Sequence, residues 1–196
     1  MSEVIEVSTE AVALTADGRR LTADRPLTVL GIGNALAGDD GAGPALAEAL
    51  LGDLPAGATV RQASGDPLAL LEELEAGRQV LLLDACRFGG RPGETTFLRL
   101  DDPAWPAAAS PLSLHGFDLP AVFRLAQALH LPLERAWLMG VEPDGTLEGR
   151  GLSPALTEAW PTLVAGARQA VRRLLDGSAP TDPAPAPRAG THAPAH

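Results

Sequence analysis

Four consecutive apolar residues closed by an aspartate, Val80-Leu81-Leu82-Leu83-Asp84, constrain the fold more than any other feature of this chain. Side chains of a strand point alternately to its two faces, so a strand that is apolar at every position is buried on both faces. Such strands are typical of parallel sheets that are covered by helices on both sides. We therefore predict an α/β protein with residues 80–84 in a central strand.

The chain between residues 27 and 176 alternates between strand and helix patterns. Short apolar and β-branched runs predict strands at 27–32, 59–62, 80–84, 95–100 and 135–141. Amphipathic spacing and capping residues predict helices at 44–51, 67–75, 117–129 and 154–175. The strand at 95–100 follows a turn and is expected to be antiparallel. Strands alternating with helices predict a three-layer α/β/α sandwich.

The two ends of the chain differ from this middle part. Residues 1–26 form an N-terminal extension in which Asp17-Gly18 is a hairpin signal. Residues 177–196 are rich in proline and alanine and lack an apolar period. Such a segment cannot bury enough apolar surface to offset its ordering entropy, so we predict a disordered tail. The prediction is one domain, residues 27–176, between two appendages.

Composition excludes several classes of function. The formal charge is −10, with scattered arginines and no lysine, which argues against binding nucleic acid or an anionic membrane. The absence of lysine also excludes Schiff-base chemistry. A single cysteine, Cys86, excludes an internal disulfide, and the first residues carry no secretory signal. We expect a cytoplasmic protein.

A glycine-rich segment follows the first predicted strand: Gly31-Ile32-Gly33-Asn34-Ala35-Leu36-Ala37-Gly38-Asp39-Asp40-Gly41-Ala42-Gly43. A dinucleotide-binding loop begins in the same way, but Leu36 stands where its third glycine is required. Two adjacent carboxylates would also repel a pyrophosphate. One aspartate is enough to cap the following helix. The second carboxylate of the Asp39-Asp40 pair is therefore free to bind a cation or to position a proton.

Two further residues join this segment as candidates for a metal site. Asp84 ends the central strand, and His115 precedes the predicted helix at 117–129. Each alone is ordinarily a turn, cap or solvated residue. However, adjacent parallel strands bring Asp40 and Asp84 towards one crevice, and the helix after His115 returns to the same sheet. Two carboxylates and an imidazole leave open positions on a divalent ion and suit nickel, zinc or iron.

Two nucleophile hypotheses compete with the metal site. Ser64, Asp84 and His115 occur in the chain order of the α/β-hydrolases, but Ser64 lacks the Gly-x-Ser-x-Gly elbow that exposes such a nucleophile. Cys86 is the only thiol, although a single cysteine just past a buried strand is more often a small core residue.

The chain resembles the hydrogenase maturation endopeptidases across about residues 27 to 175. Four blocks carry the resemblance: Gly31-Ile32-Gly33-Asn34 with Asp39-Asp40-Gly41-x-Gly43, Leu83-Asp84-Ala85, Ser113-x-His115, and Gly140-Val141-x-Pro143 followed by Gly151-Leu152-Ser153-Pro154. The first block is the most specific. The resemblance implies a twisted, mostly parallel five-stranded sheet between helices.

What the resemblance implies about function is specific. Proteins of this family remove a short C-terminal extension from the large-subunit precursor of a nickel–iron hydrogenase after nickel has been inserted. The family's metal ligands map onto Asp40, Asp84 and His115, and the first of them is glutamate in many members and aspartate in others. The expected partner is that precursor, with neither nucleic acid nor membrane. The expected metal is nickel carried by the substrate, with other divalent ions able to replace it in vitro.

These expectations define a metal-recognising endopeptidase with Asp40, Asp84 and His115 as both catalytic and metal-binding residues. A bound cation would polarise the scissile carbonyl or lower the pKa of an attacking water. Asp39 and Asn34 are candidate supporting residues, and Asp39 is the candidate for a general base. The alternative from another class is a metal-checking chaperone that binds the same precursor without cutting it.

Overall fold

The computed structural model describes residues 26–62, 68–102, 110–111, 119–145 and 151–181. Its sheet has five strands in the order β2-β1-β3-β6-β4, and a two-residue strand, β5, pairs with β3 beside this path. The strands are β1 (Leu27–Gly31), β2 (Ala58–Gln62), β3 (Gln79–Arg87), β4 (Thr95–Arg99), β5 (Ser110–Pro111) and β6 (Ala136–Val141). Strands β2, β1, β3 and β6 are parallel, and β4 is antiparallel to β6. The predicted α/β fold with a mostly parallel sheet is confirmed.

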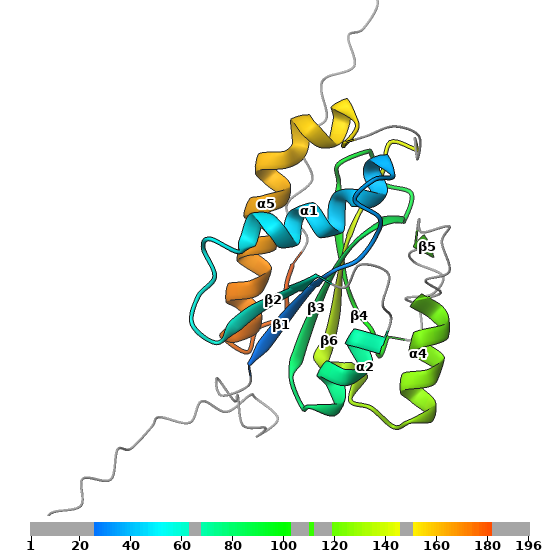
Figure 1. The fold of residues 1–196 in the computed structure, drawn as a ribbon, viewed down its shortest axis with the longest axis vertical. Helices are drawn as coiled ribbons and strands as arrows, with labels where there is room; N and C mark the ends of the chain where they lie inside the picture. Colours follow the sequence, from blue (N-terminus) through cyan, green and yellow to red (C-terminus); the bar gives the residue numbers. More distant parts are fainter. Residues whose placement is uncertain (1–25, 63–67, 103–109, 112–118, 146–150, 182–196) are drawn as a thin grey trace, which may run out of the picture.

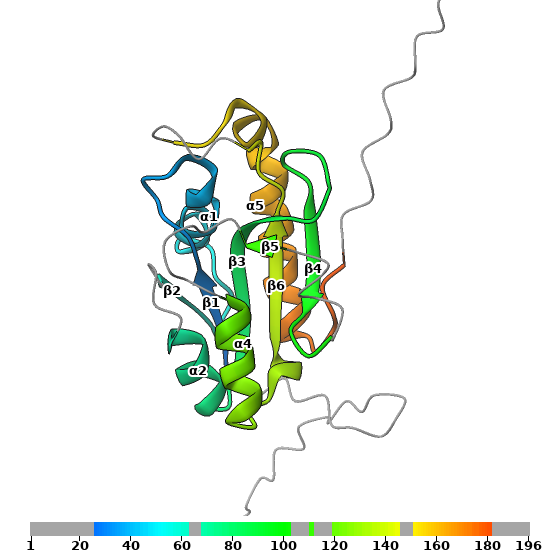
Figure 2. The same cartoon turned by 90° about the vertical axis from the view of Figure 1, so that its right-hand side faces the viewer.

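Helices cover both faces of this sheet, which gives the three predicted layers (Figures 1 and 2). Helices α1 (Ala42–Leu50) and α5 (Pro154–Leu175) pack on one face, and α2 (Leu68–Glu75) and α4 (Leu119–Ala128) pack on the other. Two short 3₁₀ helices, η1 (Gly38–Gly41) and η2 (Leu133–Arg135), precede α1 and β6. In the part of the chain that the structure describes, no helix has the length and apolar character needed to cross a membrane.

Strand β3 occupies the centre of the sheet, as its sequence predicts, and residues 80–86 are all buried. Leu82 and Cys86 belong to the core under α2 and α4, whereas Leu81 and Leu83 belong to the core under α1 and α5. Because the side chains alternate, Asp84 lies on the α2/α4 face of the sheet.

The observed boundaries differ from the prediction in a few places. Helix α1 begins at Ala42, before Pro44, and the short strand β5 has no pattern in the sequence that predicts it. Ser153 caps α5 as expected, since its Oγ accepts a hydrogen bond of 3.3 Å from the amide of Leu156. Residues 1–25 and 182–196, which hold the hairpin signal and most of the predicted tail, lie outside the described residues.

The backbone of helix α1 lies in direct contact with the backbone of the sheet, because Gly31 and Gly43 have no side chains to separate them. A Cβ on Gly31 would lie 2.7 Å from the Cβ of Ala47 and from the carbonyl oxygen of Gly43. A Cβ on Gly43 would lie 2.2 Å from the carbonyl oxygens of Ile32 and Leu83. Only glycine permits this approach. The contact holds the start of α1, and with it η1, against the carboxyl ends of β1 and β3.

We predict that Gly43→Ala destabilises the domain by about 3 kcal/mol or prevents folding. The added Cβ would overlap the carbonyl oxygens of Ile32 and Leu83, and backbone atoms cannot move away as a flexible side chain can. Gly52→Ala is the matched control, since no atom lies within 4 Å of its added Cβ, and it should change the free energy of unfolding by less than about 0.5 kcal/mol. Urea unfolding followed by circular dichroism measures both. Equal stability of the two variants would contradict this close packing.

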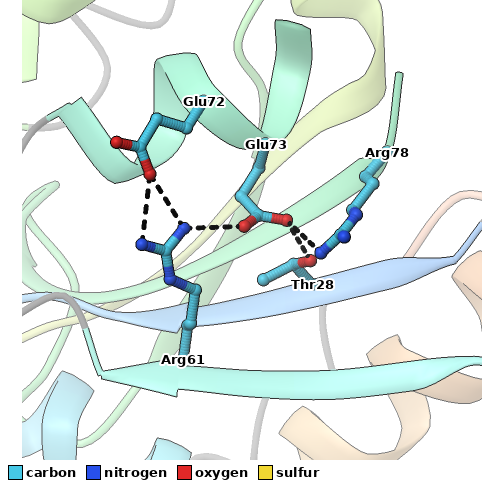
Figure 3. Close-up of polar contacts among 5 residues, drawn as sticks. All are labelled: Thr28, Arg61, Glu72, Glu73 and Arg78. Carbon is cyan, nitrogen blue, oxygen red and sulfur yellow. Dashed lines mark hydrogen bonds and ion pairs between the residues drawn. The ribbon is translucent and has the colours of Figure 1, made fainter. Parts of the chain in front are cut away.

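A buried carboxylate, Glu73, joins α2 to the sheet through hydrogen bonds and ion pairs (Figure 3). It accepts hydrogen bonds from Thr28 Oγ1 at 2.5 Å, Arg61 Nη1 at 2.8 Å and Arg78 Nη1 at 3.0 Å. Arg61 also pairs with Glu72 on the exposed side of α2, with both guanidinium nitrogens 3.1 Å from one carboxylate oxygen. These donors provide Glu73 with the partners that a buried charge requires.

The donors around Glu73 determine its charge state. Burial alone would raise the pKa of Glu73, but the hydrogen bonds from Thr28 and Arg61 and the charge of Arg78 outweigh burial, so the pKa lies below its usual value of 4.5. The hydrogen bonds to Glu73 and Glu72 in turn raise the pKa of Arg61. Glu73 therefore contributes stability above the pKa of an unfolded glutamate, and this contribution is lost as the pH falls through the lower folded pKa.

We predict that Glu73→Gln lowers the free energy of unfolding by about 1–3 kcal/mol at pH 7, because charge-assisted hydrogen bonds are lost at a site that is 4% exposed. The difference from the wild type should shrink as the pH falls from about 4.3, the pKa of an unfolded glutamate, towards the lower pKa of the folded state. Glu72→Gln is the control: its side chain is 59% exposed, so a change within about 0.5 kcal/mol is expected. Urea titrations at pH 3.5, 5 and 7 test this, and a difference that does not vary with pH would contradict it.

Candidate functional site

The carboxyl ends of β1, β3 and β6 meet at one edge of the sheet, next to β5 and the segment that follows β1 (Figure 1). Ligand sites of open α/β sheets lie at this edge. Among the sequence-predicted residues, Asn34, Asp39 and Asp40 lie in the segment after β1, and Asp84 lies in β3.

Asp39 is a fully buried residue that joins three parts of the chain. Its Oδ1 accepts a 2.7 Å hydrogen bond from the amide of Ser153, at the start of α5, and its Oδ2 accepts a 2.9 Å bond from the amide of Asp144, after β6. The N-cap residues of η1 and α1 are Ala37 and Gly41, so neither aspartate of the pair occupies an N-cap position. With an amide on each oxygen, Asp39 orients these segments, and its role as a general base stays a prediction.

Asp40 is also buried, and it is connected to the turn at residues 34–37. Its Oδ2 accepts a 2.9 Å hydrogen bond from the amide of Asn34. The Oδ1 of Asn34 accepts a bond of the same length from the amide of Leu36, and the carbonyl of Asn34 accepts one from Ala37. Asn34 therefore shapes the turn and donates its amide to the Asp40 carboxylate, and its supporting role in a functional site stays a prediction.

Asp84 is the least compensated carboxylate in the described part of the chain. It is completely buried, and neither of its oxygens accepts a hydrogen bond of normal geometry from the described residues. Burial is the largest cause that raises its pKa well above the usual 3.8, and the negative charge of Asp40 raises it further, while the nearby amide of Ala85 opposes the shift. Asp40 thus lies close enough to Asp84 for their charges to interact.

The pair of Asp40 and Asp84 can hold either a shared proton or a cation. In the described residues no basic side chain forms an ion pair with Asp84, so its charge has no partner of the kind that Glu73 has. A strongly perturbed carboxylate beside a second carboxylate is typical of functional sites. Oxygen ligands of this kind bind divalent metal ions.

Three further residues were predicted as site candidates: His115, Ser64 and Cys86. His115 and Ser64 lie outside the described residues, so the third proposed ligand and the Ser64 hydrolase stay predictions. No group of three metal-ligating side chains forms among the residues that are described. Cys86 is buried, and burial, followed by the charges of Asp84 and Glu142, raises the pKa of its thiol. This environment favours a core residue over a nucleophile.

Glu142 is a buried carboxylate that the sequence prediction missed. It follows β6, and its Oε2 accepts hydrogen bonds from the amides of Phe88 at 2.8 Å and Gly90 at 3.1 Å. It therefore ties the segment after β3 to the end of β6. The available signal was a glutamate directly after an apolar strand and before Pro143, but sequence spacing gives no indication of its partners.

Comparison with known proteins identifies the family to which the chain belongs. A family model described as "Hydrogenase maturation protease" matches residues 54–170. The hydrogenase expression/formation protein HupD of Rhodobacter capsulatus is 32% identical over 149 residues, which cover 74% of this chain and 70% of HupD. The chain therefore belongs to the hydrogenase maturation protease family, and it is an endopeptidase.

Solved structures agree with this assignment. The hydrogenase maturating endopeptidase HybD from E. coli is similar with a TM-score of 0.60 and 26% identity, over 74% of this chain and 91% of HybD. An endopeptidase from Escherichia coli studied in solution is similar with a TM-score of 0.62 and 25% identity, over 80% of this chain and 96% of that protein. The family-model match includes Asp84 but begins after Asp39 and Asp40.

We predict that Asp84→Asn makes the metal-free protein more stable at pH 7, by about 1 kcal/mol or more, since an unpaired buried charge is costly. The pKa of Asp84 is raised on folding, so the wild type loses stability as the pH rises above the unfolded value of about 3.9. The asparagine variant has no such loss from this position.

Urea unfolding in the presence of a chelator at pH 4 and pH 7 tests this prediction. The two proteins should differ least at pH 4, and the advantage of Asp84→Asn should grow towards pH 7. A variant less stable than the wild type at pH 7 would show that the Asp84 carboxylate is compensated in the folded protein.

Proposed function

We propose that this endopeptidase removes the C-terminal extension of a nickel–iron hydrogenase large-subunit precursor after nickel insertion. Asp40, Asp84 and His115 recognise the nickel that the precursor carries. The metal belongs to the substrate, so a precursor without it is not cut.

The observation that carries this proposal is the buried pair of Asp40 and Asp84. Asp84 is a buried carboxylate that accepts no hydrogen bond of normal geometry from the described residues, and it lies next to a second carboxylate at the ligand-binding edge of an α/β sheet. Such an arrangement is unfavourable without a cation. A positively charged ion brought by the substrate would supply the missing partner.

The position of β5 supports His115 as the third ligand. Pro111 of β5 pairs with Cys86, two residues beyond Asp84. Three residues separate Pro111 from His115, and the four Cα-to-Cα steps between them span at most about 14 Å. The connection is thus compatible with an imidazole that reaches the Asp40–Asp84 pair. A neutral imidazole is a suitable ligand for nickel.

A cation at this position would polarise the scissile carbonyl or lower the pKa of an attacking water. Asp40 and Asp84 would hold it, and its positive charge would offset the burial and the negative charge of Asp40 that raise the pKa of Asp84. Asp39 would keep Asp40 aligned with the segment after β6 and with α5, since both of its oxygens bind amides there.

The proposal is tested by incubating the purified protein with nickel-loaded precursor and measuring the precursor mass. We predict that the wild type removes a C-terminal peptide, and that Asp40→Asn, Asp84→Asn and His115→Ala each lower the rate by about 100-fold or more. An amide is a poorer metal ligand than a carboxylate, and alanine supplies no ligand. Precursor without nickel should remain uncut.

Matched variants separate loss of the site from general damage. His130→Asn is the control for His115, because His130 is an exposed residue at the end of α4 with φ 54°, a conformation that asparagine tolerates. Asp39→Asn should slow cleavage without abolishing it. Equal loss from Asp39→Asn and Asp40→Asn would contradict their different roles, and unchanged cleavage by a folded His115→Ala would contradict the three-ligand site.

A further inference from the structure

We propose that Leu36 is a substrate-contact residue, which binds an apolar side chain of the precursor next to the Asp40–Asp84 pair. The inference rests on the proposed function and deepens it, because it adds an apolar determinant to recognition of the metal.

Leu36 is the most exposed large apolar residue among those described, with 74% of its surface accessible. It lies within the turn at residues 34–37, in which the amide of Ala37 bonds to the carbonyl of Asn34. Such turn positions favour glycine, asparagine, aspartate or serine. A leucine at this place exposes apolar surface that a polar turn residue would not expose. Burial of that surface against a partner would be favourable.

The turn that carries Leu36 is held firmly against Asp40. Asn34 accepts the amide of Leu36 on its side chain and donates its own amide to Asp40, each at 2.9 Å. Thus a single residue connects the Leu36 backbone to the carboxylate of the site. A side chain presented on an ordered turn loses less entropy on binding than one on a mobile loop.

Glycines on both sides of this turn bring it into backbone contact with the site. A Cβ on Gly33, where φ is +123°, would lie 1.9 Å from the carbonyl oxygen of Asp40. A Cβ on Gly41 would lie 3.1 Å from the Cα of Ala35. Leu36 is therefore held in a constant place relative to Asp40, which is what a residue that positions the substrate beside the metal requires.

Other exposed leucines show that exposure alone does not identify such a contact. Leu51, at the end of α1 remote from η1, is 56% exposed and lies away from the site. It serves as the matched control, because it is an exposed leucine outside the turn at residues 34–37 and has no connection to Asp40.

The test measures kcat and KM for cleavage of nickel-loaded precursor, together with the affinity for the same precursor immobilised on a biosensor. Leu36→Ala should raise KM and Kd about tenfold, equivalent to about 1.4 kcal/mol, with kcat within twofold, because a contact made equally in the ground and transition states affects binding only. Leu36→Met should restore values within twofold of the wild type. Melting temperatures should be unchanged, since Leu36 contributes little packing.

The possible outcomes distinguish this inference from the proposed function. Leu51→Ala should cleave and bind the precursor as the wild type does. An equal rise of KM in both alanine variants overturns the role of Leu36, and so does the absence of a rise in Leu36→Ala. Either result leaves the proposed function standing. If the wild type binds the precursor without cutting it, the proposed function fails and the affinities alone decide the role of Leu36. If the wild type neither binds nor cuts the precursor, both are overturned.

Discussion

The close contact of α1 with β1 and β3 is the constraint on which the site depends. Gly43 approaches the carbonyl oxygens of Ile32 and Leu83 so closely that no side chain fits between them. This contact places η1, with Asp39 and Asp40, directly at the end of the central strand. The buried position of the two carboxylates of the site, Asp40 and Asp84, therefore follows from backbone packing. A larger separation between helix and sheet would admit water and weaken the electrostatic coupling of the pair.

Two buried carboxylates on the same face of the fold show the difference between a structural and a functional charge. Glu73 receives donors from Thr28, Arg61 and Arg78, and its pKa is lowered. Asp84 receives no hydrogen bond of normal geometry from the described residues, and its pKa is raised. The first stabilises the fold at neutral pH, whereas the second destabilises it unless a cation or proton arrives. A buried charge that destabilises the fold, such as that of Asp84, is expected at a functional site where a binding partner compensates it.

The sequence predicted those features that depend on local pattern. The apolar run ending in Asp84 predicted the central strand, and Ser153 predicted the start of α5, because burial and capping leave short-range signals. It did not predict strand β5 or the partners of Asp39 and Glu142. These carboxylates bind backbone amides more than fifty residues away in the chain, and any residue except proline offers an amide, so no residue type marks the partner.

The glycine-rich segment shows why a similar beginning leads to a different site. In a dinucleotide-binding loop, glycines leave room for a pyrophosphate at the helix N-terminus. Here the corresponding space is filled by the protein itself: the carbonyl of Asp40 lies against Gly33, and those of Ile32 and Leu83 lie against Gly43. Asp39 and Asp40 are buried at the entrance of α1, and negative charge on these carboxylates would repel an anion. The glycines thus serve the packing of the chain around Asp40 rather than the binding of a pyrophosphate.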